Sequence, residues 1–239
     1  MSKVSDYILN RLNTLLPLPD RQSALPDALR GVHRTFLRSL VEKGRPPSEE
    51  EIGAIAPGGD AFAALWTLGA NDLVVLDRSG KPCGAYPITT ERTPHRVLVD
   101  GNHIYAMCAF DAVSVAPMFD KHVESWTRCP VTGAEIHIEQ KGRQILKIEP
   151  GADVQIGVWW RDPRGLAARN LCPGIMALRD GATATAWQAG RTEDHEFASV
   201  EDAVDVALRF FRPLVTGERF ESKLGEKAPA TTRAVTAHA

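Results

Sequence analysis

The chain contains the run Val97-Leu98-Val99-Asp100-Gly101-Asn102-His103-Ile104-Tyr105, followed directly by Ala106-Met107-Cys108-Ala109-Phe110-Asp111-Ala112-Val113. In the first segment an Asp-Gly pair lies between apolar residues, which predicts two strands joined by a tight turn. The second segment begins a predicted helix over residues 109–116, and Pro117 is expected to end it. Cys108 is therefore expected where a strand meets the N-terminus of a helix.

The spacing of Cys108 and Asp111 places both side chains on one face of the first helical turn. The partial positive charge of a helix N-terminus favours a thiolate, which predicts a lowered pKa for Cys108. A soft nucleophile and a proton carrier would then lie side by side. The same spacing also fits a small buried cysteine beside an Asp that caps the helix, so spacing alone leaves both interpretations open.

Composition excludes several classes of function. The chain has 239 residues, 44% of them hydrophobic, and a formal net charge of -2. These values fit one large domain or two small ones, and they argue against a general binder of nucleic acid or membrane surfaces. Residues 1–10 do not resemble a signal peptide, and no apolar run reaches the roughly 18 residues that span a bilayer. We therefore expect a soluble, cytoplasmic protein with no membrane or nucleic-acid partner.

The cysteines are far apart in the sequence and include no C-x-x-C pair: Cys83, Cys108, Cys129 and Cys172. In a cytoplasmic chain of this size we expect free thiols rather than a disulfide framework. A structural zinc site normally shows paired ligands at close spacing, and none is present.

The first third of the chain predicts helices. Apolar residues recur at helical spacing over residues 4–16, from Asp27 to about Gly44, and over residues 60–68, while Ser48 and Glu51 form a capping-box signature. Two short strands around the turn at residues 77–80 would complete the outline of a winged helix. Yet residues 1–80 hold nine Lys or Arg and ten Asp or Glu, and the helix at 60–68 holds no basic residue. Because phosphate neutralisation needs basic residues, we interpret this part as a scaffold.

The rest of the chain predicts an α+β pattern. Strands are expected at 96–99, 102–106, 134–139, 143–148 and 154–160, and a late helix from Ser199 to Phe211, ended by Pro213. We expect a helical, winged-helix-like subdomain over residues 1–80, followed by a mainly antiparallel-sheet catalytic domain over residues 81–215. Residues 216–239 are expected to form a disordered tail.

Two motifs make the chain resemble the alkylmercury lyase (organomercurial lyase) family. They are Tyr105-Ala106-Met107-Cys108-Ala109-Phe110-Asp111, with Pro117 at the helix end, and Arg128-Cys129-Pro130-Val131-Thr132-Gly133. The order of a helical N-terminal region and a cysteine-bearing domain agrees as well. A further cysteine, in Asn170-Leu171-Cys172-Pro173-Gly174, falls where the family has its second catalytic cysteine.

By position, the resemblance implies catalytic roles for Cys108, Asp111 and Cys172, which would also hold the mercury of substrate or product. It implies a structural role for Cys129, and it gives no role to Cys83.

Two residues depart from the family pattern. Met107 stands where the family carries an aromatic residue, and Pro173 stands where a second adjacent cysteine occurs. These departures bear on the shape of the pocket and on activity more than on the fold.

The resemblance implies protonolytic cleavage of the carbon–mercury bond, giving a hydrocarbon and Hg(II). The residue types support this chemistry independently, because soft mercury prefers thiolate ligands and a carboxyl group can carry a proton. We expect an organomercurial substrate, no organic cofactor or resident metal, assistance from external thiols, and mercuric reductase as downstream partner in mercury resistance.

The alternative is a metal- or thiol-sensing regulatory protein that keeps the fold without lyase activity. The winged-helix outline and the altered neighbours of both cysteines motivate this alternative, and the near-neutral charge of the N-terminal region weakens it.

Overall fold

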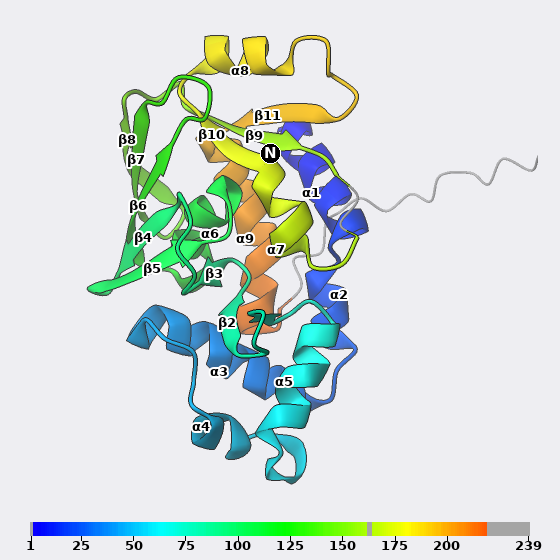
Figure 1. Cartoon of the computed structure of the whole chain (residues 1–239). Coiled ribbons are helices and arrows are strands. Elements are labelled where there is room, and N and C mark those ends of the chain that lie inside the picture. Colours follow the sequence, from blue (N-terminus) through cyan, green and yellow to red (C-terminus); the bar gives the residue numbers. More distant parts are fainter. Residues whose placement is uncertain (1, 162–163, 219–239) are drawn as a thin grey trace, which may run out of the picture.

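The computed structural model describes residues 2–161 and 164–218, and Figure 1 shows its mixture of helices and sheets. Every strand pairing among these residues is antiparallel. Helices come first in the chain and the sheets follow, with α6 and α9 packed among them. This architecture confirms the predicted fold class, α+β with N-terminal helices ahead of a mainly antiparallel sheet.

Local capping signals set the boundaries of the N-terminal helices. Ser48 and Glu51 form a complete capping box at the start of α4, and the Asp60 side chain caps α5. The helices of this region are α1 (Lys3–Leu15), α2 (Leu18–Ser23), α3 (Asp27–Lys43), α4 (Glu49–Gly53), the 3-10 turn η1 (Pro57–Gly59) and α5 (Ala61–Ala70).

Two details of this region concern the starts of its helices. The short helix α2 contains Pro19, because a proline in the first helical turn has no backbone bond to lose. Helix α3 begins at Asp27, where the apolar spacing predicted it, and its N-cap is Pro26.

The larger sheet has the strand order β1-β2-β3-β5-β4-β6-β7-β8, and the smaller one β10-β9-β11. β4 and β5 form the predicted hairpin, with Asp100 and Gly101 in the left-handed region at φ 50 and 80. β6 is absent from the predicted strands. Its three inward residues are Val123, Ser125 and Thr127, and because two of them are polar the sequence does not show an alternation of apolar and polar residues. The strands are β1 (Val75–Leu76), β2 (Pro82–Ala85), β3 (Ile88–Thr89), β4 (Arg96–Val99), β5 (Asn102–Ala106), β6 (His122–Arg128), β7 (Glu135–Lys141), β8 (Gln144–Glu149), β9 (Gln155–Trp159), β10 (Ile175–Leu178) and β11 (His195–Ser199).

The helix α6 (Ala109–Phe119) runs past Pro117, so the predicted end of this helix is wrong. A proline inside a helix leaves the carbonyl four residues earlier without its usual donor. That carbonyl belongs to Val113, and Nε2 of Gln140 in β7 donates to it at 3.3 Å. The helix ends instead at Asp120, which takes the left-handed conformation at φ 55.

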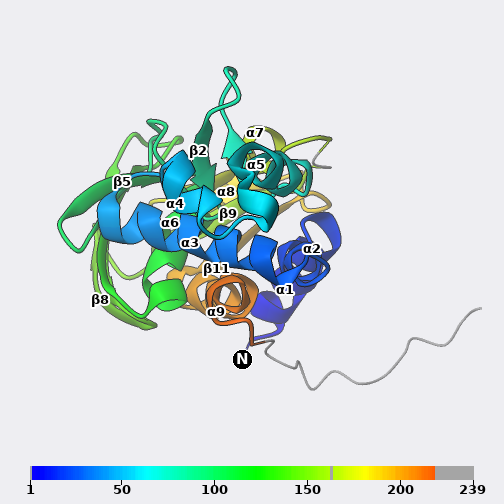
Figure 2. The ribbon, with the colours of Figure 1, turned by 90° about the horizontal axis from the view of Figure 1, so that it is seen from below.

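The long helix α9 (Val200–Thr216) packs against α6 and completes the core. It begins after the Ser199 N-cap as predicted, but the predicted end is wrong: Pro213 lies in its last turn, and the helix continues to Thr216 because it packs against α6, α1 and α2. The rings of Phe110 in α6 and Phe211 in α9 lie 5.8 Å apart. Figure 2 shows α9 almost end-on, with α1 and α2 on one side and the large sheet on the other. The site helix α6 is therefore held between a sheet and a long helix.

Smaller elements complete the description: α7 (Ala167–Asn170), the 3-10 turn η2 (Cys172–Gly174) and α8 (Gly181–Gln188). None of the described helices is long and apolar enough to cross a lipid bilayer. The division into a subdomain of residues 1–80 and a catalytic domain of residues 81–215 stays a prediction. Residues 219–239, most of the predicted tail, lie outside the described residues.

Candidate active site

The junction between β5 and α6 presents Cys108 at the start of the helix. Cys108 has an extended backbone and is the N-cap of α6, and its Sγ accepts a hydrogen bond from the backbone N–H of Asp111 at 3.3 Å. The thiol, and not the carboxyl group, therefore caps the helix. This leaves the carboxyl of Asp111 free for other partners.

Cys172, which lies far from Cys108 in the sequence, is next to Asp111 in the structure. It follows the short helix α7, and its Sγ lies 3.7 Å from Oδ2 of Asp111. The ligand atoms of Cys108, Asp111 and Cys172 all lie within 4.8 Å of one another. Their residues are only 1%, 2% and 4% exposed. The structure thus brings the three predicted site residues together in a nearly dry cluster, and their catalytic roles stay a prediction.

Burial decides the protonation of this cluster. It raises the pKa of Asp111 from 3.8 to about 7, although hydrogen bonds from both thiols favour the carboxylate. Burial also raises the pKa of Cys108 well above its ordinary value, and the hydrogen bond with Cys172 and the nearby Asp111 raise it further. The predicted lowering of this pKa is therefore wrong, since desolvation outweighs the helix N-terminus.

Cys172 is subject to opposing effects. The hydrogen bond from Cys108 lowers its pKa, but burial and the nearby carboxyl of Asp111 outweigh that effect and leave the pKa raised. Near neutral pH the site therefore holds two thiols and a carboxyl group that is about half ionised, because its pKa is about 7. A soft cation entering this site would find a proton acceptor beside each thiol.

The other two cysteines lie elsewhere, and all four are free thiols, as predicted. Cys129 follows β6 and is buried in a turn. Burial tends to raise its pKa, but hydrogen bonds from the Thr132 side chain and from backbone N–H groups lower it on balance. Cys83 donates to the carbonyl of Val75 at 3.4 Å, and burial raises its pKa to about 11. Both cysteines are outside the Cys108–Asp111–Cys172 cluster.

A small cavity of about 140 Å³ adjoins the cluster through its sequence neighbours. Its lining includes Met107, which precedes Cys108, and Ala168 of α7. Arg169 and Glu91, both at this cavity, form an ion pair at 3.2 Å. Sequence reasoning noted Met107 only as a departure and missed the other residues, because nothing local in the sequence joins α7 to the loop after β3.

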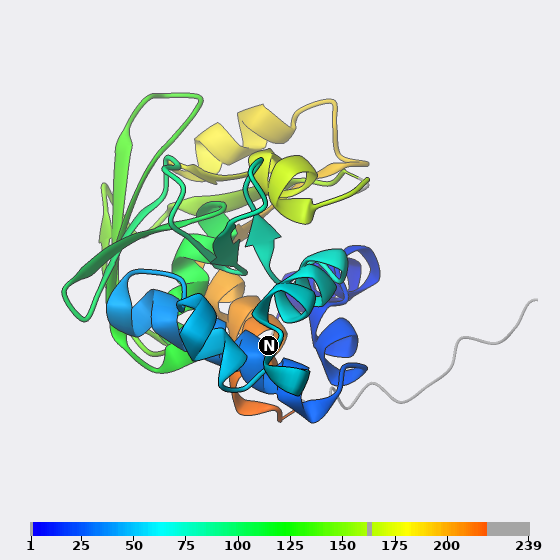
Figure 3. The same cartoon turned by 60° about the horizontal axis from the view of Figure 1, so that its bottom comes forward.

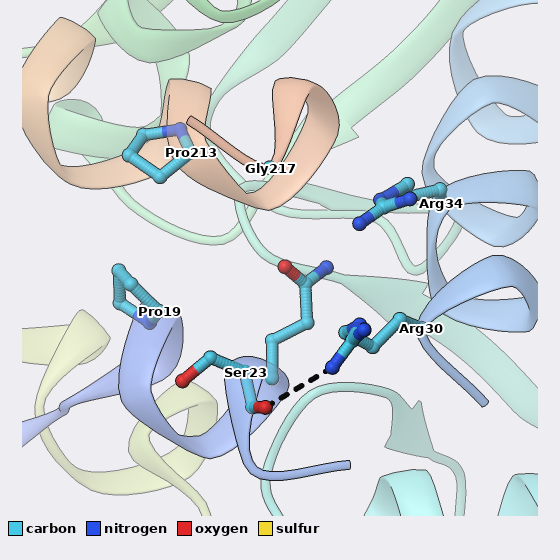
Figure 4. Close-up of a pocket in the computed structure, with 7 residues that line it drawn as sticks. Pro19, Ser23, Arg30, Arg34, Pro213 and Gly217 are labelled. Carbon is cyan, nitrogen blue, oxygen red and sulfur yellow. Dashed lines mark hydrogen bonds between the residues drawn. The ribbon is translucent and has the colours of Figure 1, made fainter. Parts of the chain in front are cut away.

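A larger cavity, of about 250 Å³, lies between α2, α3 and the end of α9. Figure 4 shows its lining, with Arg34 and Arg30 facing Pro213 and Gly217. Arg30 donates to the backbone carbonyl of Ser23 at 3.2 Å. None of the three cluster residues lines this cavity, so its size alone does not make it the site.

Known proteins with similar sequences share one activity in their names. Residues 88–212 match the family model for MerB, alkylmercury lyase, which is more than half of the chain. The alkylmercury lyase of Staphylococcus epidermidis is 27% identical over 175 residues, covering 72% of this chain and 78% of the relative. The alkylmercury lyase of Streptomyces lividans is 25% identical over 178 residues, covering 74% of this chain and 79% of the relative. The alkylmercury lyase of Bacillus cereus is 31% identical over 133 residues, covering 56% of this chain and 60% of the relative.

A solved structure described as the mercury-bound form of MerB2 has a similar fold. Its TM-score is 0.72 at 18% identity, with 87% of this chain and all 100% of the other covered. At this identity the similarity supports the fold alone. The family match, by contrast, spans the segment that contains Cys108, Asp111 and Cys172. The chain therefore belongs to the alkylmercury lyase family, whose enzymes cleave organomercurials.

Proposed function

We propose that this enzyme holds the mercury of its substrate between Cys108 and Cys172, and that Asp111 carries the proton which releases the hydrocarbon. One observation supports this proposal above all. Two buried thiols and a buried carboxyl group have their ligand atoms within 4.8 Å of one another. Soft mercury takes thiolate ligands, and the carboxyl group lies within reach of both sulfurs.

The first step is capture of the organomercury cation, R–Hg⁺. Cys108 forms a sulfur–mercury bond, and its proton moves to the carboxylate of Asp111, whose pKa of about 7 suits a proton acceptor near neutral pH. The backbone N–H of Asp111, which donates to Sγ of Cys108, helps to stabilise the negative charge that develops on the sulfur.

The second step breaks the carbon–mercury bond. Cys172 forms a second sulfur–mercury bond and passes its proton to Asp111, while Asp111 delivers its own proton to the carbon. The products are R–H and Hg(II) bound by two thiolates, with Asp111 protonated. Overall, the cation and two thiols give the hydrocarbon, the bis-thiolate complex and one proton. The nearly complete burial of the three residues keeps water from competing with this transfer.

Product release completes the cycle. Two external thiols exchange with the bound mercury, so that each cysteine regains a proton and Hg(II) leaves as a complex of the external thiols. Mercuric reductase is the downstream acceptor that we expect. This cycle requires no resident metal or organic cofactor.

The test is turnover by the pure, reduced protein. Methane from methylmercury or benzene from phenylmercury is measured with excess thiol, and stoichiometric hydrocarbon release is the expected result. If no hydrocarbon forms while the protein binds promoter DNA in a mercury-dependent way, the protein is a sensor on this fold and the proposal is wrong.

A further inference from the structure

The short helix α7 begins without a capping side chain of its own. Its N-cap, Leu166, accepts no hydrogen bond through its side chain, so the first backbone N–H groups of the helix need acceptors from elsewhere. Two buried side chains from distant parts of the chain supply them. Ala167 N–H donates to Oδ2 of Asp72 at 3.1 Å, and Ala168 N–H donates to the hydroxyl of Tyr86 at 2.6 Å.

The two acceptors also bind each other. The Tyr86 hydroxyl donates to Oδ1 of Asp72 at 2.9 Å, so both carboxylate oxygens are engaged. Asp72 is 6% exposed and Tyr86 is 1% exposed, which makes their hydrogen bonds hard to replace with water. Nη1 of Arg21 in α2 lies 3.5 Å from Oδ2 of Asp72.

The backbone conformation of Asp72 is also specific. Asp72 follows α5 in a left-handed conformation at φ 55, which Asp tolerates better than most residues. Figure 3 shows α7, in yellow-green, on the side of the molecule that faces α5, in cyan. The loop that follows the N-terminal helices thus binds, through Asp72, the element that leads to the second thiol.

A hydrogen-bonded backbone connects these caps with Cys172. Leu171 N–H donates to the carbonyl of Ala167 at 2.9 Å, and Gly174 N–H donates to the carbonyl of Leu171 at 2.9 Å. Cys172 is therefore held in a short, continuous stretch of turns whose first N–H groups are fixed by Asp72 and Tyr86. A displacement of the start of α7 would move the Cys172 sulfur relative to Cys108.

We propose that Asp72 and Tyr86 are positioning residues, which hold Cys172 at the distance from Cys108 that lets both sulfurs bind one mercury ion. The proposal deepens the function proposed above and rests on it only for the cleavage step, because binding of Hg(II) alone reports on the same geometry. It also assigns the N-terminal region, which supplies Asp72, a part in shaping the site beyond that of a scaffold.

The experiment is a double-mutant cycle with Hg(II) as probe. Tyr86→Phe is made in the wild-type and in the Cys172→Ser backgrounds, and Hg(II) affinity is measured by competition with a dithiol chelator. We expect Tyr86→Phe to lower affinity by roughly 10-fold in the wild type, the lower end of the effect of removing outer-shell partners of a metal ligand, because Tyr86 acts on Cys172 through the backbone of α7. In the Cys172→Ser background it should cause no further loss, because the two changes act through one sulfur. The rate of hydrocarbon release in a single turnover should fall by a similar factor.

The control is Tyr7→Phe, which removes an exposed hydroxyl that accepts a hydrogen bond from Arg11 at 2.8 Å and should change neither quantity. If Tyr86→Phe does not fold, Asp72→Asn, which keeps the side-chain volume, enters the same cycle. Equal losses of affinity in both backgrounds would show a general structural role and overturn the proposal, as would wild-type affinity and rate in the Tyr86→Phe protein. A wild-type protein that binds Hg(II) but cleaves nothing would overturn the proposed function and leave the affinity cycle as a valid test of positioning.

Discussion

Replacing Asp111 with asparagine should make the protein more stable at neutral and alkaline pH, even though it should slow the reaction. Burial raises the pKa of this carboxyl from 3.8 to about 7. The unfolded chain therefore loses the Asp111 proton near pH 4, whereas the folded protein keeps it until about pH 7. Between these values the folded state binds more protons, so rising pH favours unfolding. Asparagine has nearly the same shape and does not titrate.

The size of the stability change follows from the difference between the pKa of Asp111 in the unfolded and in the folded protein. About three pH units at 1.36 kcal/mol each correspond to about 4 kcal/mol, which is the cost of ionising this carboxyl in its buried position. The advantage of Asp111→Asn over the wild type should therefore grow by about 4 kcal/mol between pH 4 and pH 8. This increase in the stability advantage should be largely complete near pH 7. This is a large share of the stability of a typical domain.

The assay is urea-induced unfolding of reduced wild type and Asp111→Asn at several pH values from 4 to 8, with the difference between the two taken at each pH. Taking the difference removes the titration of common groups that Asp111 does not influence, and the thiols of Cys108 and Cys172, which it does influence, stay protonated over this pH range. The same substitution at exposed Asp60, where asparagine can still cap α5, shows how far an Asp-to-Asn change alone alters the pH dependence. A difference between wild type and Asp111→Asn that stays constant across this range would refute the reasoning, because the carboxyl would then not be perturbed by burial.

Four further outcomes are expected. Asp111→Asn should slow hydrocarbon release by roughly 10²–10⁴-fold and leave Hg(II) affinity largely intact, as single-turnover assays and competition titrations would show. Cys172→Ser should nearly abolish release, because a hydroxyl is a poor ligand for a soft metal; full activity would point to another thiol as the partner. Cys129→Ala should cost about 1–3 kcal/mol in urea unfolding, because it removes a buried sulfur that accepts hydrogen bonds from Thr132 and from backbone N–H groups, with the cleavage rate unchanged. Ser199→Ala should cost about 0.5–2 kcal/mol, since the Asp202 N–H loses its acceptor at the start of α9, and an unchanged unfolding midpoint would contradict this.

Local patterns predicted the features whose causes are themselves local. The turn at Asp100-Gly101, the capping box at Ser48 and the junction at Cys108 each depend on residues within a few positions of one another, and all are present in the structure. The family resemblance also predicted Cys172 as a site residue, although its spacing from Cys108 in the sequence does not indicate that the two lie close together.

Features that depend on distant partners were beyond such patterns. Pro117 does not end α6 because Gln140, from a later strand, supplies a donor to the freed carbonyl of Val113. The pKa of Cys108 has the opposite sign from the prediction for a similar reason. The helix N-terminus is a local feature and was recognised, but the desolvation that outweighs it comes from the packing of the whole domain around the sulfur.

Because the pKa of Cys108 is raised and not lowered, the proposed reaction must begin with the removal of its proton. An exposed thiolate at a helix N-terminus would be ready to bind any soft or oxidising species in the cell. Here Cys108 is buried and protonated, so it becomes a good ligand only when its proton has somewhere to go. In the proposed mechanism Asp111 accepts that proton, and its raised pKa of about 7 suits it to return the proton afterwards. Protonated thiols are also less prone to oxidation and to exchange with disulfides. Burial thus protects the free cysteines, and in the proposed mechanism the carboxyl group beside them speeds capture by accepting the thiol proton and then delivers a proton for cleavage.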